Sequence, residues 1–196
     1  MRKAREPTYS FLILTLVLIV INIILARLSI IALPAGATGV SMIYVAVGVM
    51  VLVTLWFGAY GAIAAYVGTL VGSGLLASNP SIPPVVAVYW SIAGLLQVLI
   101  PLVAFRSFDA DPALENRRDW TILLLFGVLL NNIVGAVWGA VTLAVGGVIS
   151  SGEVGGVIFT WLLGNIIVCL LIVPAGLRFL TPKVQGSKLF VKNYWD

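Results

Sequence analysis

The sequence contains no histidine, a single cysteine and few charged residues. Without histidine, the chain lacks the usual general base and the commonest metal ligand. A single cysteine excludes an internal disulfide and a cysteine-based metal cluster. The sequence also shows no nucleophile beside a base, no pair of carboxylates within an apolar run and no P-loop. We therefore expect neither an enzyme nor a bound metal or cofactor.

Charged residues form 9% of the 196 residues and hydrophobic residues form 61%, whereas soluble domains carry about 25% charged residues. Water cannot be the main solvent of such a chain. The basic residues flank apolar runs and form no continuous patch, so the formal charge of +4 does not predict binding of nucleic acid. The composition predicts an all-α integral membrane protein with one transmembrane domain over residues 1–196, surrounded by the lipid bilayer.

Turn-forming stretches divide the apolar sequence into segments near the length of about 20 residues that crosses a bilayer. The divisions lie after Ala32, at the small hinge Gly58-Ala59, at Asn79–Pro84 and in two more polar stretches. We expect a six-transmembrane-helix bundle with spans at 9–32, 40–57, 60–77, 85–105, 120–148 and 154–180.

The distribution of positive charge predicts how this bundle is oriented. With six spans, every basic residue except Arg27 falls on one side, as the positive-inside rule requires. This predicts a multi-pass protein of the cell membrane with both termini in the cytoplasm. The basic and aromatic tail, residues 181–196, is interpreted as a topology anchor at the headgroup boundary or as a docking segment for a cytoplasmic partner.

Small residues recur at helical spacing in two spans, where they let helix backbones approach closely. We interpret them as packing positions inside the bundle or as a smooth face for a partner helix. They are Gly61, Ala65, Gly68 and Gly72 in the third span and Gly135 and Gly139 in the fifth.

Amide side chains lie deep within the apolar spans, where each must find a partner or face water. Asn131, Asn132 and Asn165 stand about eleven residues into their spans and Gln97 about twelve, so a rise of ~1.5 Å per residue places them near the midplane. Their meeting predicts either a set of interhelical hydrogen bonds or the floor of a binding cavity.

Aromatic residues lie on the outer side of these amides. Tyr89, Trp90, Trp138 and Trp161 could form the walls of a pocket for a small, flat, partly polar ligand. Arg27 should reach the outer boundary, where it either extends to the headgroups, pairs with the acidic Glu153 or contacts an anionic group of the ligand.

The chain resembles the substrate-binding S components of energy-coupling factor transporters. The resemblance lies in the size, the six spans, the stretch Ala32-Leu33-Pro34-Ala35-Gly36-Ala37-Thr38, and the stretch Leu55-Trp56-Phe57-Gly58-Ala59-Tyr60-Gly61-Ala62. It implies capture of a vitamin-like micronutrient from outside, with the loop between the first two spans as a lid over the last three. It also implies partners, namely an energising module with two ATPases and a membrane scaffold subunit.

The second half of the chain is also similar to the multi-span sensor domains of histidine kinases and cyclic-di-GMP enzymes. This similarity rests on Trp161-Leu162-Leu163-Gly164-Asn165 and on the ending from Val173-Pro174 to Thr181-Pro182. The first hypothesis is therefore a small-molecule-binding subunit of an uptake transporter. A stand-alone sensory domain with a partner protein, or a structural or assembly subunit of the membrane, are the alternatives.

Overall fold

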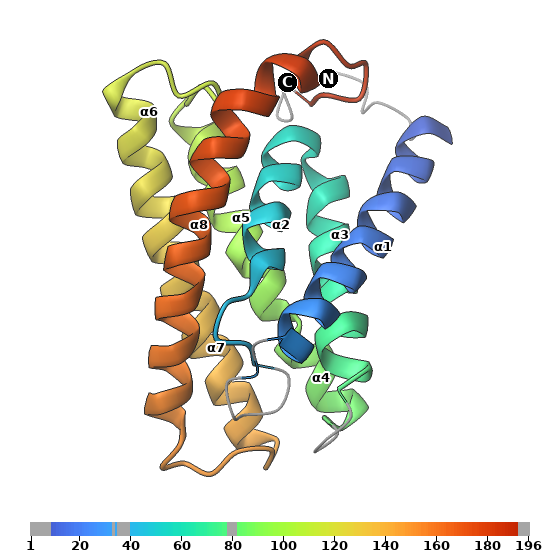
Figure 1. The fold of residues 1–196 in the computed structure, drawn as a ribbon, viewed down its shortest axis with the longest axis vertical. Helices are drawn as coiled ribbons and strands as arrows, with labels where there is room; N and C mark the ends of the chain where they lie inside the picture. The colour runs from blue at the N-terminus through green and yellow to red at the C-terminus, as the bar shows by residue number, and fades with distance from the viewer. Residues whose placement is uncertain (1–8, 33, 35–39, 78–81, 192–196) are drawn as a thin grey trace.

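The computed structural model describes residues 9–32, 34, 40–77 and 82–191, and its regular elements in these ranges are all helical (Figure 1). A lone antiparallel bridge joins Pro34 to Ser41. The elements are α1 Tyr9–Ala32, α2 Val45–Phe57, α3 Ala59–Thr69, the π-helical η1 Leu70–Leu75, α4 Pro84–Trp90, α5 Ile92–Ser107, α6 Arg117–Ile122, the π-helical η2 Leu123–Leu130, α7 Asn131–Val145 and α8 Val154–Gln185.

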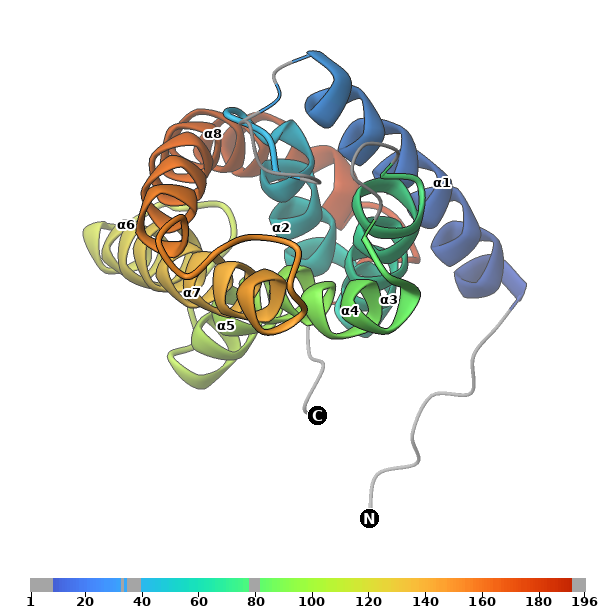
Figure 2. The same cartoon turned by 90° about the horizontal axis from the view of Figure 1, so that it is seen from below.

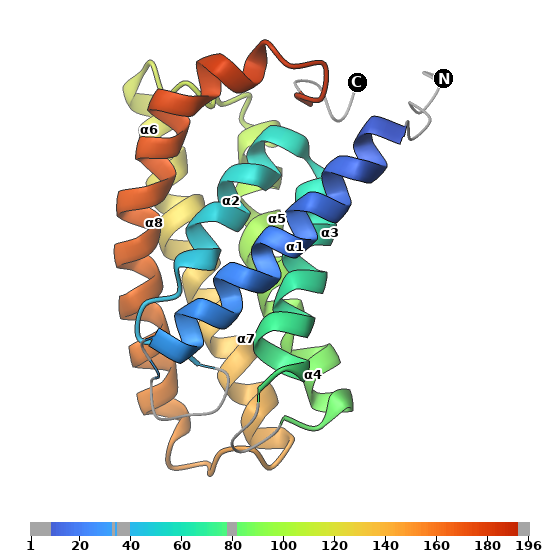
Figure 3. The ribbon, with the colours of Figure 1, turned by 45° about the vertical axis from the view of Figure 1, so that its right-hand side comes forward.

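The helices pack as an antiparallel bundle, seen from the side in Figures 1 and 3 and along its axis in Figure 2. The start of α1, the α2–α3 turn, the α5–α6 connection and the end of α8 share one end of the bundle, which we call the basic end. The α1–α2 and α7–α8 connections lie at the opposite end. The basic residues on the described elements of the first end are Arg106, Arg117, Arg118, Arg178, Lys183 and Lys188.

Four helical runs are long and apolar enough to cross a membrane. They are Tyr9–Ala32, Pro84–Ser107, Arg117–Val145 and Val154–Gln185. The two remaining apolar runs, Val45–Phe57 and Ala59–Leu75, are shorter. The expected span 40–57 thus becomes helical only at Val45, whereas the expected span 85–105 lies within the run Pro84–Ser107, in which Ser91 joins α4 to α5.

The turn between α2 and α3 is formed by Gly58, at the hinge predicted from the sequence. Gly58 adopts a φ of 61°, a conformation that residues with a side chain rarely adopt, and its N–H donates to the carbonyl of Thr54 at 2.8 Å. At Gly61, a Cβ would lie 2.5 Å from the backbone of Thr54. The two short helices therefore form a hairpin whose close approach depends on these glycines.

The small residues of α3 and η1 pack against helices of the same chain. Gly68 leaves the space that the Asn22 side chain of α1 occupies, and Gly72 lies against Ile23. The Nδ2 of Asn22 donates to the carbonyl of Ala64 at 3.1 Å, and Ala65 is fully buried. Gly68 and Gly72 therefore pack against α1, whereas Gly61 packs against α2.

Two buried apolar clusters lie along the bundle. The larger cluster joins α2, α3, α5, η2 and α8 and includes Met50, Phe105 and Leu123. The second cluster joins α4, α7, α8 and the residues around them, and it is built from alanines around Trp90 and Trp161. An interior cavity borders this cluster at Val40, Trp90 and Trp161.

Candidate functional site

Three of the four deep amides form one hydrogen-bonded group, which we call the amide cluster. The Nε2 of Gln97 on α5 donates to the Oδ1 of Asn132 on α7 at 2.8 Å, and the Nδ2 of Asn131 donates to the carbonyl of Gln97 at 3.2 Å. The Nδ2 of Asn132 donates to the Val128 carbonyl at 2.7 Å. All three amides are buried, although the Oδ1 of Asn131 has no partner within the described residues. The cluster therefore joins α5 to α7.

Room for this cluster comes from a glycine on α7. A Cβ at Gly135 would overlap the side chain of Gln97. The small residues predicted in the fifth span thus hold a different role from those in α3, because they make space for polar and aromatic side chains of neighbouring helices.

An interior cavity lies directly beside the amide cluster and shares Gln97 with it. Its volume is about 20 Å³, and a single water molecule needs roughly 10–15 Å³ on the same measure. The cavity brings together the α1–α2 connection, the end of α3, the α4–α5 junction and α8. Its lining residues are Val40, Ser41, Tyr44, Thr69, Trp90, Gly94, Gln97, Trp161 and Asn165.

Three hydrogen-bond donors of these lining residues have no acceptor. They are the indole Nε1 of Trp90, the indole Nε1 of Trp161 and the amide Nδ2 of Asn165, each buried and without a partner among the described residues. A buried donor without a partner costs about 1–3 kcal/mol, and buried polar groups in native proteins nearly always have one. Three such donors among the lining residues mark this cavity as the candidate site, and its volume admits an ordered water as an acceptor.

The indole rings of Trp90 and Trp161, which both line the cavity, pack edge to face against each other. Their ring centroids are 5.8 Å apart with planes at 73°, a favoured geometry for aromatic pairs. Gly139 on α7 makes this possible, because a Cβ there would lie 2.5 Å from the ring of Trp161. The positions of the two rings are therefore set by each other and by the missing side chain at Gly139, where an added Cβ would lie 3.2 Å from the Nε1 of Trp90.

The segment Val40–Tyr44, which we call the covering segment, closes the cavity. The Oγ of Ser41 donates to the carbonyl of Ser29 at 2.8 Å, and the hydroxyls of Tyr44 and Ser73 hydrogen-bond at 3.0 Å. The carbonyl of Met42 lies against Gly164 of α8 so closely that a Cβ at that glycine would overlap it. The covering segment is thus attached to α1, η1 and α8.

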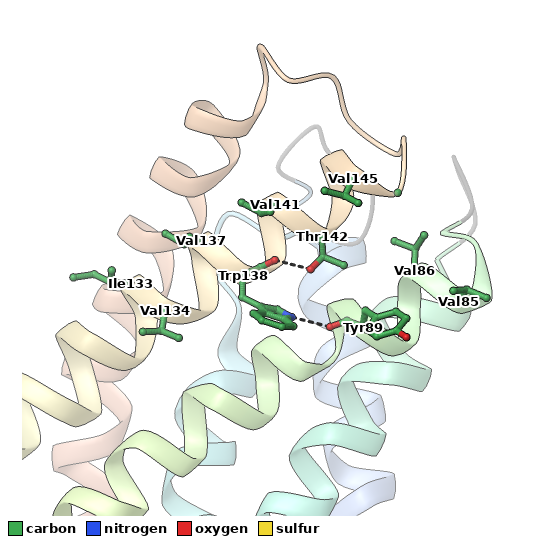
Figure 4. Close-up of a pocket in the computed structure, with 11 residues that line it drawn as sticks. Val85, Val86, Tyr89, Ile133, Val134, Val137, Trp138, Val141, Thr142 and Val145 are labelled. Carbon is green, nitrogen blue, oxygen red and sulfur yellow. Dashed lines mark hydrogen bonds between the residues drawn. The ribbon is translucent and has the colours of Figure 1, made fainter.

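Tyr89 and Trp138 do not line this cavity, so the single aromatic pocket expected from the sequence is divided in two. They lie on the outer surface, in a groove of about 770 Å³ between α4 and α7 (Figure 4). The Nε1 of Trp138 donates to the carbonyl of Tyr89 at 2.8 Å, and the two residues are 40% and 57% exposed. Most of the other residues lining this α4–α7 groove are valines, a surface suited to lipid.

The two charged residues considered at the outer boundary are not among the lining residues of the cavity. Arg27 is half-buried on α1. Glu153 precedes α8 and accepts hydrogen bonds from the backbone N–H and the hydroxyl of Ser150, both at 2.7 Å. These bonds lower the pKa of the Glu153 carboxyl.

Sequence reasoning missed the lining residues outside the last three expected spans. Ser41 and Tyr44 lie in the run predicted as the start of the second span, and Thr69 lies between Gly68 and Gly72 of the predicted third span. A search for hydroxyl groups within apolar runs, in addition to amides, could have found all three.

The described residues form an all-helical bundle with long apolar helices, a short helical hairpin and a buried polar centre. This arrangement is compatible with a membrane protein. No family model, curated protein or solved structure matches the chain.

Proposed function

We propose that this protein is a membrane subunit that binds a small, vitamin-like molecule for uptake from the outer face. The observation that supports this function is the set of three unpartnered N–H donors around the interior cavity. The amide nitrogens of the amide cluster donate to acceptors inside the protein, whereas these three donors have no partner within the described residues. A bound molecule with acceptor atoms would satisfy them once displacement of the covering segment had enlarged the cavity beyond its present volume of about 20 Å³.

The proposed membrane arrangement has six crossings with both termini in the cytoplasm. The helix α2 has 13 residues and rises only ~20 Å, but the covering segment extends its path toward the far side. Non-helical backbone is tolerated at membrane depth where protein buries it. The basic end would face the cytoplasm under the positive-inside rule. Green fluorescent protein fused to the C-terminus should then fluoresce in cells, and a dark fusion made at normal levels would contradict this orientation.

The ligand would reach the cavity by displacement of the covering segment. This segment belongs to the connection between the first two spans, which acts as the lid in the transporter family that the sequence resembles. By the same resemblance, the loaded protein would pass its ligand to an energising module with two ATPases through a membrane scaffold subunit.

Native mass spectrometry of the full chain, purified in mild detergent from a bacterial host, tests the function. We expect the wild-type protein to carry a small-molecule adduct of defined mass. The substitution Gly164→Ala places a Cβ against the Met42 carbonyl and should push the covering segment from α8, so that occupancy falls at least tenfold. Gly156→Ala on the same helix is the matched control, because a Cβ there has nothing within 4 Å.

The outcomes separate the candidate functions. A wild-type protein without any adduct, or equal occupancy in Gly164→Ala and Gly156→Ala, would contradict the proposed site. If the ligand-free protein instead co-purified with a histidine kinase, the sensory alternative would replace uptake.

A further inference from the structure

A groove at the basic end of the bundle lies between the segment around α6 and the second half of α8 (Figure 1). We call it the α6–α8 groove. Its volume is about 460 Å³, and ligand-binding clefts in proteins commonly hold about 300–1,000 Å³. The groove shares no lining residue with the interior cavity, and the uptake function proposed above does not use it.

The position of the groove along α8 corresponds to the level of lipid headgroups. Arg178, which lines the groove, stands ~36 Å along α8 from Val154 at a rise of ~1.5 Å per residue. The hydrocarbon core of a bilayer is about 30 Å thick. Pro174 and Ala175 line the groove about one turn deeper in α8. In the membrane arrangement proposed above, the groove therefore extends from the headgroups toward the acyl chains.

Two aromatic side chains contribute to the apolar part of the groove. Trp120 of α6 and Phe179 of α8 are both lining residues, and both are exposed. The indole Nε1 of Trp120 donates to the carbonyl of Leu114 at 3.0 Å, so its polar atom already has a partner in the protein. Exposed aromatic rings at this depth suit the region between headgroup and acyl chain.

The groove also carries one basic and one acidic side chain, Arg178 and Glu115. Both are exposed. No ion pair joins them, and neither has another hydrogen-bond or ionic partner among the described residues. A guanidinium binds phosphate oxygens through paired N–H groups, and a carboxylate accepts hydrogen bonds from an ammonium group. These two side chains together complement a headgroup that contains both a phosphate and an ammonium group.

We propose that the α6–α8 groove binds a phospholipid with a phosphoethanolamine headgroup. Arg178 binds the phosphate, and Glu115 accepts hydrogen bonds from the primary ammonium. The rings of Trp120 and Phe179 contact the glycerol and the upper part of the acyl chains. A phosphocholine headgroup has the same charges, but its trimethylated nitrogen has no N–H to donate. A phosphoglycerol headgroup lacks the cation and brings its negative charge near Glu115. Both are therefore weaker ligands.

Native mass spectrometry of the full chain in mild detergent tests this preference. Phosphatidylethanolamine, phosphatidylcholine and phosphatidylglycerol with the same acyl chains are added in equal amounts, and the fraction of protein that carries each lipid is measured. We expect phosphatidylethanolamine to bind about threefold more than either of the others, the size of effect that one exposed charge pair gives. Equal binding of the three lipids, or a preference for either of the others, would overturn the proposal.

Two substitutions at exposed positions, where the fold is expected to tolerate them, assign the headgroup contacts. Glu115→Gln removes the partner of the ammonium, so binding of phosphatidylethanolamine should fall to the level of phosphatidylcholine. Arg178→Gln removes the partner of the phosphate and should weaken all three lipids about threefold.

Glu153→Gln and Lys188→Gln are the matched controls, because they remove an acidic and a basic side chain that do not line the groove. Both should keep the wild-type preference. A preference for phosphatidylethanolamine that survived Glu115→Gln, or that Glu153→Gln removed equally, would overturn the assignment.

The phospholipid site and the uptake function can fail separately. A phospholipid adduct has the mass of the added lipid and should weaken in Arg178→Gln, whereas the uptake ligand should be lost in Gly164→Ala. A protein that bound phosphatidylethanolamine selectively but carried no other adduct would keep the groove assignment and lose the uptake function. The opposite result would keep the function and remove the lipid site.

Discussion

Two neighbouring polar regions in the centre of the bundle differ in how completely they are hydrogen-bonded. In the amide cluster, Gln97 and Asn132 bond to each other and to backbone, with distances of 2.7–3.2 Å. In the interior cavity, Trp90, Trp161 and Asn165 have N–H groups without acceptors in the described chain. Both regions are almost fully buried, so burial alone does not distinguish them.

This difference distinguishes polar groups that hold the helices together from polar groups that are available to a bound molecule. Polar groups in a membrane interior must be paired by the protein or by something else. Where the protein pairs them, as between α5 and α7, they hold helices together. Where it does not, they carry a cost that a bound molecule can remove. Substitutions that remove the amide group from one region at a time test this distinction.

The largest effect on stability is expected from Asn132→Leu. Leucine has the same number of side-chain heavy atoms and the same branching as asparagine, although its methyl groups make it larger, and it removes the acceptor for Gln97 and the donor to the Val128 carbonyl. The Nε2 of Gln97 would remain buried without a partner, so the free energy of unfolding should fall by about 1–3 kcal/mol. Detergent-induced unfolding monitored by circular dichroism measures it. An unchanged unfolding curve would show that the cluster contributes nothing to stability.

An asparagine-to-leucine substitution in the cavity should not lower the free energy of unfolding. Asn165→Leu removes an amide whose Nδ2 has no acceptor in the described structure, so the ligand-free protein should keep its unfolding free energy or gain up to about 1 kcal/mol. Ligand occupancy should fall at the same time. Equal destabilisation of the ligand-free protein by Asn165→Leu and by Asn132→Leu would contradict the difference between the two regions.

Much of the helical framework could be predicted, because hydrophobic length and glycine or proline breaks are local signals. The hinge at Gly58 is an example, since a residue without Cβ was needed where φ is 61°. The covering segment could not be predicted. Val40 and Met42 are apolar, and an apolar run reads as helix whether it crosses lipid or lies buried in protein.

Depth along a helix was predictable, but rotation about its axis was not. Counting residues from the ends of the spans correctly placed Gln97 near Asn132. The same count placed Trp138 with Trp161. However, Trp138 lies on the outward side of α7, whereas Trp161 of α8 packs against the inward side of α7 at Gly139. Gly135 and Gly139 face the interior, whereas Trp138 shares the outward side with Val134 and Val141. At 3.6 residues per turn, one position rotates a side chain by about 100°, which is enough to move it from the core to lipid.

The smallest effect is expected from Trp138→Phe, which tests that rotation directly. The substitution removes one hydrogen bond, from the indole Nε1 to the Tyr89 carbonyl, at an exposed site. The unfolding free energy should change by no more than about 0.5 kcal/mol, and the occupancy measured by native mass spectrometry should equal that of the wild type. A loss of occupancy as large as that caused by Asn165→Leu would move the ligand from the interior cavity to the α4–α7 groove. The unpaired donors of the cavity would then be satisfied by ordered water, which a space of about 20 Å³ admits.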